Sequence, residues 1–244
     1  MREVLHLDFN PGSVAWLGSL QSRVANSPSP ELRKRYEAWS SAGLGELALA
    51  IATRLGIAKR VEERLRESIT TLAREVEESG QLDSLIADSS CFRPSDEKVL
   101  FDICSGVDAC FFEWRSLYEV LGKFAKTFAI EILHTEITEA QLKGAVSGSG
   151  VPIEWMELLR DNRKLFFHQT APWIALEITS RKPLVLAILV MKENLSSFED
   201  AEKFVTEAEL VQASNGLRRA VDVVRDWLAE QVVTLERELA ASAD

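Results

Sequence analysis

Arg163 and His168 are the pair of residues whose types and spacing are best suited to chemistry. They lie in the segment LRDNRKLFFH (159–168), which gathers three cations, an amide and one of only three histidines in a chain of net charge −10. An arginine stays charged at any physiological pH, whereas a histidine titrates near neutrality. Together they can bind a phosphate and move a proton without a metal ion. We expect any chemistry of this chain to lie in this segment.

Helix geometry limits how the two side chains can meet. On an ideal helix, residues five apart point about 140° away from each other. Arg163 and His168 therefore converge only through the reach of the arginine, through a kink, or across the two-fold axis of a dimer. Pro172 supplies a reason for a kink, because its ring clashes with the carbonyl four residues earlier, which belongs to His168. The sequence thus predicts His168 at or near a helix end.

Helical patterns dominate the rest of the chain. Pro30 suits the first turn of a helix, and Ser79-Gly80 suits the end of another. The segment Ser147–Gly150 reads as a flexible linker, and Pro152 then suits the first turn of the helix that carries the motif. Gly56 separates two apolar patterns. Helices are expected near 31–36, 38–55, 58–78, 95–134, 152–168 and 206–235.

The longest of these patterns predicts a central buried helix. Apolar residues recur every three or four positions from 95 to 134, and Ser95 is placed to cap the helix. The phenylalanines and the tryptophan of this stripe are best interpreted as core. Thr206 and Glu209 match a capping box, which predicts the start of the final helix.

A β-hairpin is predicted after the motif. Two apolar runs, Trp173–Ile178 and Leu184–Val190, are separated by a polar connector of hairpin length. We predict a hairpin over 173–190, although a leucine-rich run is also compatible with a buried helix. The fold class is therefore mainly α. Residues 1–92 form an N-terminal helical region, and residues 93–244 form a helical bundle with the hairpin.

Composition excludes several classes of function. At 244 residues and 46% hydrophobic content the chain can bury a substantial core. With a pI of about 5.0 its surface as a whole cannot attract a nucleic acid, so any such contact must be local. The sequence contains no phosphate loop, no dinucleotide motif and no hydrolase elbow, and its histidines have no metal-ligand spacing. We expect no metal and no cofactor.

The sequence predicts a cytoplasmic location and no membrane span. The N-terminus carries acidic residues where a secretory signal would be apolar, and the longest apolar run, Leu184–Met191, is too short to cross a bilayer. Three cysteines without a close pair indicate reduced thiols.

The pair Arg163 and His168, with four residues between them, resembles the Arg-x4-6-His signature of the HEPN superfamily (higher eukaryotes and prokaryotes nucleotide-binding). The phrase FFHQTAPWIA (166–175) is also similar to a group of bacterial HEPN-like proteins in which an apolar hairpin follows the histidine. The resemblance implies a compact helical bundle, here with extra N-terminal helices, that is usually dimeric. Active members are metal-independent endoribonucleases of defence, stress or toxin systems.

The resemblance implies a role for each residue of the motif. Arg163 would bind the scissile phosphate, and His168 would transfer a proton to or from the 2′-hydroxyl or the leaving oxygen. Asn162 or Asp161 would orient the imidazole. A substrate RNA or nucleotide would contact the local basic site and the adjoining aromatic ring, formed by Arg160, Lys164 and Trp173. Asp108 and Glu113 are further candidates for a carboxylate beside the pair.

Three alternatives stay open. In the first, the cations are a solvated basic face and His168 is a helix-end residue without a catalytic role. In the second, the chain is a non-catalytic HEPN-like module that binds a nucleotide, RNA or a protein. In the third, it is a structural helical dimer. Lys164 favours the second, because the family often has Asn, Asp or His directly after the arginine.

Overall fold

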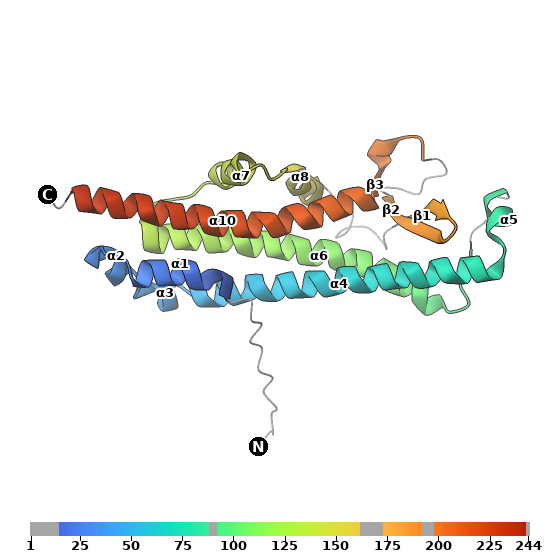
Figure 1. Ribbon diagram of the computed structural model, residues 1–244, viewed down its shortest axis with the longest axis horizontal. Coiled ribbons are helices and arrows are strands. Elements are labelled where there is room, and N and C mark those ends of the chain that lie inside the picture. Colours follow the sequence, from blue (N-terminus) through green and yellow to red (C-terminus); the bar gives the residue numbers. More distant parts are fainter. Residues whose placement is uncertain (1–14, 88–91, 162–172, 192–197, 243–244) are drawn as a thin grey trace, which may run out of the picture. The chain divides into compact units, whose positions relative to one another are not determined.

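The computed structural model describes residues 15–87, 92–161, 173–191 and 198–242 (Figure 1). They are mainly α-helical and include a small antiparallel sheet, as the sequence predicts. Their contacts form two units: a first unit from Met1–Leu55, Ser116–Pro152 and Arg218–Asp244, and a second from Gly56–Arg115 and Ile153–Leu217. Three long helices each contribute to both units: α4 (Leu44–Ser79), α6 (Glu97–Phe128) and α10 (Glu207–Ala241). The predicted division at residue 93 stays a prediction.

The apolar stripe of α6 is buried from Ile103 to Phe128, which confirms its interpretation as core, whereas Leu100 at the start of the helix is 39% exposed. Eight stripe residues are at most 4% exposed: Ile103, Val107, Phe111, Trp114, Leu117, Leu121, Phe124 and Phe128. Spacings of three and four residues keep them on one face of the helix. The helix is capped by Asp96, whose carboxylate accepts a hydrogen bond from the Lys98 amide at 2.9 Å. The predicted cap at Ser95 is therefore wrong by one residue.

Short helices complete the first unit. They are α1 (Ala15–Ala25), α2 (Pro30–Arg35), α3 (Ala38–Ser41), the π-helix η2 (Ala129–Leu133) and α7 (Glu139–Gly148). Fully buried side chains include Leu20, Leu32, Leu44, Ile51, Phe124, Phe128 and Leu228. Ser27, which is 1% exposed, donates a hydrogen bond of 2.6 Å to Glu236 of α10. This bond ties the turn between α1 and α2 to the last helix.

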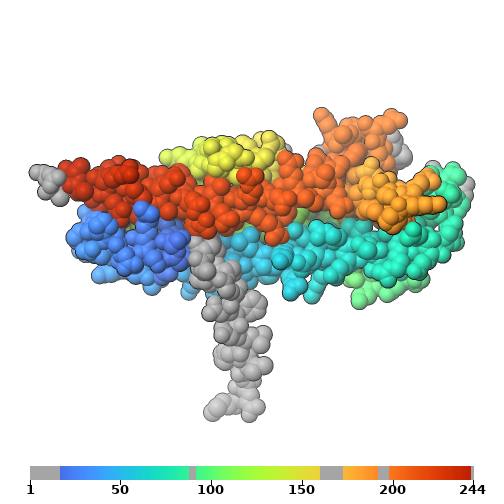
Figure 2. Space-filling view, viewed as in Figure 1, coloured from blue at the N-terminus to red at the C-terminus, as the bar shows by residue number. Residues whose placement is uncertain are grey.

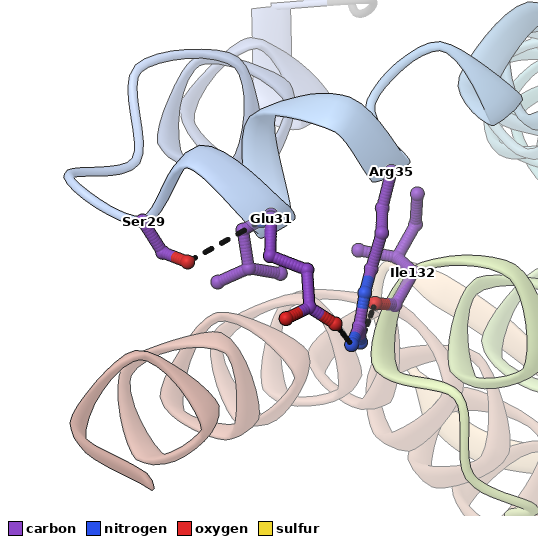
Figure 3. A network of polar contacts seen from close by, with 5 residues as sticks. Ser29, Glu31, Arg35 and Ile132 are labelled. Atoms are coloured by element: carbon purple, nitrogen blue, oxygen red, sulfur yellow. Dashed lines mark hydrogen bonds and ion pairs between the residues drawn. The ribbon is translucent and has the colours of Figure 1, made fainter. Parts of the chain in front are cut away.

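Arg35 joins α2 to the end of the π-helix (Figure 3). Its guanidinium donates to the carbonyl of Ile132 at 3.0 Å and pairs with Glu31 one turn earlier. Ser29 caps α2 by accepting a hydrogen bond from the amide of Leu32, and Pro30 occupies the first turn, as predicted. A carbonyl near the end of a helix has no partner within the helix, so the arginine satisfies a group that would otherwise face the interior.

Three predicted boundaries differ from the structure. The pattern over 38–55 is two helices, because the chain turns at Gly43, whose φ of +68° lies in the left-handed region that glycine adopts without strain. The segment Ser147–Gly150 is only partly a linker, since Ser147 and Gly148 form the last turn of α7. Conversely, α4 passes through Gly56 without a break.

A three-stranded sheet belongs to the second unit. The strands β1 (Trp173–Arg181), β2 (Leu184–Met191) and β3 (Phe204–Thr206) pair antiparallel in the order β1-β2-β3. The predicted hairpin is thus confirmed, and β3 is an addition to it. The unit also contains α5 (Leu82–Ala87), α8 (Glu154–Asp161) and the short 3-10 helix η3 (Ala201–Lys203).

One face of the sheet packs on helices of the same unit. Leu184 of β2 clusters with Ala73 and Val76 of α4.

The predicted capping box at the start of α10 is present, because the Thr206 amide donates to the Glu209 carboxylate at 2.8 Å and the Glu209 amide donates to the Thr206 hydroxyl at 3.3 Å. The sheet and the start of α10 are therefore joined by backbone continuity and by capping.

We predict that Phe128→Ala lowers the free energy of unfolding by about 3–5 kcal/mol. The Phe128 ring is fully buried, lies edge-on to Trp39 with centroids 6.0 Å apart and stacks on Phe124 at 6.1 Å, so its removal leaves a cavity. Urea unfolding followed by circular dichroism measures the change. Ile130→Ala is the control, because Ile130 is 54% exposed and should change stability by less than about 0.5 kcal/mol. Equal losses in both variants would contradict the assigned core.

Candidate functional site

The candidate motif falls between α8 and β1. The described part of α8 runs to Asp161, and β1 is described from Trp173 onward, so the predicted helix over 152–168 is tested only as far as Asp161. Four predicted site residues, Asn162, Arg163, Lys164 and His168, lie outside the described residues, so their roles stay predictions.

Two predicted substrate-binding residues border that segment. Arg160 belongs to the last turn of α8, although its side chain is outside the described part. Trp173 is the first residue of β1 and is 47% exposed, and its contact with a ligand stays a prediction.

α8 is fixed by an apolar face on one side of the helix. Trp155, Met156 and Leu159 are at most 7% exposed, whereas Glu154 and Glu157 face solvent. These carboxylates lie in the first turn, where their negative charge interacts favourably with the positive end of the helix dipole and stabilises α8. The buried apolar face therefore anchors α8 just before the candidate motif.

A glycine of α10 makes room for that anchor. Figure 1 shows α8 beside α10. A Cβ atom at Gly216 would lie 2.4 Å from Cδ1 of Trp155, closer than any ordinary contact. The indole thus packs directly against the α10 backbone. Because the contact leaves no space for a side chain at position 216, it fixes where α8 lies along α10.

Glu113 is a buried carboxylate in the same unit as the motif. It lies on α6 and is only 7% exposed. Asp108, the other candidate, is exposed, and partial burial raises the pKa of its carboxyl above the ordinary value. A buried carboxylate is stable as a charge only when donors or a cation face it. Of the two candidates, Glu113 therefore better fits a role beside an arginine and a histidine.

The second unit also contains a small cavity lined by α4, α6, α10 and β2. Its walls are mostly apolar, and its polar groups come from Glu62, Arg66, Glu207 and Ser214. Its volume of about 60 Å³ leaves room for a few water molecules, whereas ligand pockets usually measure about 300–1,000 Å³. This cavity is too small for a nucleotide.

Glu62 organises the polar side of the cavity. Its carboxylate accepts hydrogen bonds from the Trp114 indole at 2.9 Å and from the Ser214 hydroxyl at 2.7 Å, which joins all three long helices. Burial, and to a smaller extent the charge of Glu62, raise the pKa of the Cys110 thiol to about 12. Cys110 is therefore protonated at neutral pH and is a poor nucleophile.

A larger open groove of about 490 Å³ lies between α4 and α6 in the same unit. It is lined by two cations, Arg64 and Lys98, and by two carboxylates, Glu67 and Asp102. These charges balance, so the groove offers no net attraction to a phosphate backbone.

Sequence reasoning missed the Glu62 network. Glu62 lies in the strongly charged part of α4, where a carboxylate is usually solvated, and Trp114 was correctly expected in the core. The available signal was the indole N–H, since a buried tryptophan usually finds an acceptor.

The described ranges offer neither a metal cluster nor a single helix suited to a membrane. No group of three or more His, Cys, Asp or Glu residues there is arranged to hold a metal ion. Among the described helices none is, by itself, both long and apolar enough to cross a membrane; only the pair Pro30–Ser41 and Leu44–Ser79, bent by 63°, meets the requirement on length and composition.

No family model, curated protein or solved structure matches this chain.

We predict that Gly216→Ala destabilises the protein by about 1–3 kcal/mol, because the new methyl group would force the Trp155 ring and α8 to shift. Thermal and urea unfolding measure the loss. Gly122→Ala in α6 is the matched control, since a Cβ there meets nothing within 4 Å and should stabilise the helix by up to about 1 kcal/mol. If the two variants changed stability alike, the close packing of α8 on α10 would be wrong.

Proposed function

We propose that this chain is a HEPN-like, metal-independent endoribonuclease that uses Arg163 and His168. The observation that carries the proposal is the Arg-x4-His pair in the segment between the described parts of α8 and β1, in a mainly helical chain with an antiparallel hairpin after the histidine. That order of elements is the one expected from the resemblance.

The proposed reaction is a transesterification within the RNA. The 2′-hydroxyl oxygen attacks the adjacent phosphorus, and the bond from phosphorus to the 5′-oxygen breaks. Arg163 binds the phosphate and the charge that develops on it, while His168 accepts the hydroxyl proton or gives a proton to the leaving oxygen. The products are a 2′,3′-cyclic phosphate and a 5′-hydroxyl end.

Residues around the pair support this role. Asn162 or Asp161 orients the imidazole, and Arg160 and Lys164 contribute charge for the RNA backbone. Glu113 is proposed as the carboxylate that stabilises protonated His168, because it is a buried carboxylate of the same unit. A homodimer would bring two copies of the motif together and so relieve the poor alignment of residues five apart on one helix.

A second candidate is a non-catalytic HEPN-like module that binds RNA, a nucleotide or a protein. It is favoured by Lys164 in the position that is polar and uncharged or acidic in many members, and by the net charge of −10. In that case the same residues would contribute to binding, and no cleavage would occur.

We predict that the purified protein cleaves single-stranded RNA in excess EDTA and leaves 2′,3′-cyclic phosphate ends. His168→Ala should lower the rate about 10²–10⁴-fold, because it removes the proton-transfer group, and Arg163→Ala about 10²–10³-fold. Gel assays of end-labelled RNA and mass spectrometry of the ends measure both effects.

Matched controls are available elsewhere in the chain. Arg60→Ala removes a cation whose side chain is 81% exposed, and His134→Asn removes a histidine at a left-handed position that asparagine tolerates. Both should cleave as the parent does. Unchanged cleavage in His168→Ala and Arg163→Ala would eliminate the mechanism, and binding without cleavage by the parent protein would favour the second candidate.

Glu113→Gln tests the proposed carboxylate separately. We predict at least about a tenfold lower kcat and a shifted acidic limb of the pH–rate profile, since Gln cannot stabilise an imidazolium by charge. Glu119→Gln, an exposed change on the same helix, is the control and should leave the profile in place. An unshifted profile in Glu113→Gln would remove Glu113 from the site.

A further inference from the structure

Trp173, Met191 and Phe204 form a row across the three strands. Trp173 of β1 pairs with Met191 of β2, and Met191 pairs with Phe204 of β3. Directly paired residues of antiparallel strands point to the same face of a sheet. These three side chains therefore lie side by side on one face.

This is the outer face of the sheet. The intervening residues of β2 point the other way, where Ile188 lines the cavity between the helices and Leu184 packs on α4. Figure 2 shows β1 and β2, in light orange, at the surface of the molecule. The row thus faces away from the helices that cover the inner side of the sheet.

Phe198 extends the row. Its ring contacts that of Phe204 edge-on, with centroids 5.7 Å apart. Trp173 is 47% exposed and Phe198 is 42% exposed, while Met191 and Phe204 are half-buried. We call these four residues the aromatic platform. Exposed rings supported by half-buried neighbours are typical of protein-binding surfaces.

Exposed carboxylates accompany the aromatic platform. Glu177 lies on the same face of β1 as Trp173, four residues further along the strand. The link between Phe198 and Phe204 contributes three exposed acids and one exposed lysine: Glu199, Asp200, Glu202 and Lys203. Among the described residues, this surplus of negative charge does not favour a polyanion at these rings. It attracts a cation instead.

We propose that the aromatic platform binds a basic, arginine-containing peptide segment of another protein. A guanidinium stacks on the face of an aromatic ring and pairs with carboxylates at its edge, and the platform offers both kinds of group. The site shares Trp173 with the predicted substrate contacts of the ribonuclease proposal, but it uses neither Arg163 nor His168 and its ligand carries the opposite charge to RNA.

The probe is a fluorescent peptide of alternating arginine and glycine, titrated by anisotropy into the full chain. Two control peptides, in which lysine or glutamate replaces each arginine, are titrated in the same way. The proposal expects the arginine peptide to bind most tightly, since lysine lacks the planar group that stacks. Trp173→Ala should weaken arginine-peptide binding about tenfold and reduce the preference over lysine. Phe198→Ala should act in the same direction.

Trp173→Ala leaves the net charge unchanged. A loss of binding in this variant therefore distinguishes a specific site from the general attraction of a basic peptide to an acidic protein. Phe101→Ala is the matched control, because Phe101 is a 70% exposed ring on α6 and is not one of the platform residues. Three results would each overturn the proposal. The first is an equal loss of arginine-peptide binding in Phe101→Ala, and the second is equal binding of the arginine and glutamate peptides. The third is displacement of the arginine peptide by single-stranded RNA whose binding depends on Trp173.

Discussion

The burial of one continuous apolar stripe along each long helix is the constraint on which the rest of the structure depends. α4, α6 and α10 each contribute to both units, so each stripe must keep its phase over more than 30 residues. A helix turns by about 100° per residue, and one inserted residue would therefore rotate every later stripe residue away from its neighbours. The stripe of α6 continues into the π-helix and ends at His134, whose left-handed backbone lets the chain leave the helix. The short helices and the sheet are then placed against these three rods within their units.

The features that the sequence reveals are those that depend on local chemistry. The stripe of α6 has a helical period, the Thr206 capping box uses neighbouring residues, and the hairpin has two apolar runs joined by a short connector; all three are present in the structure. α7 is different, because Val146 is its only buried residue and its last turn contains a serine and a glycine. Such a helix depends on its surroundings more than on its own pattern. The three residues of β3 are likewise strand only because β2 lies beside them.

The candidate site likewise combines features that the sequence reveals with contacts that only the folded structure shows. Spacing along the chain identifies Arg163 and His168, and the apolar face of α8 explains how the chain is anchored just before them. No pattern in the sequence links Glu62 to Ser214, which are 152 residues apart, or predicts that Gly216 is needed to admit Trp155. These contacts are properties of the packed helices. Glu113 is intermediate: its apolar neighbours on α6 suggest burial, but only the packed unit distinguishes it from the exposed Asp108.

The position of β1 at the edge of the sheet has a consequence for solubility. Along the outer edge of this strand, backbone amide and carbonyl groups are available to template another chain, and such edges are the usual starting points of aggregation. Three features of β1 counter this tendency: the charged Glu177, the irregular register between Ile178 and Ser180, and the ion pair of Arg181 with Asp83 at 2.8 Å. Charge and a break in the pairing pattern both discourage the docking of a flat strand. The hairpin can therefore keep apolar and aromatic side chains at its surface without becoming a nucleus for fibrils.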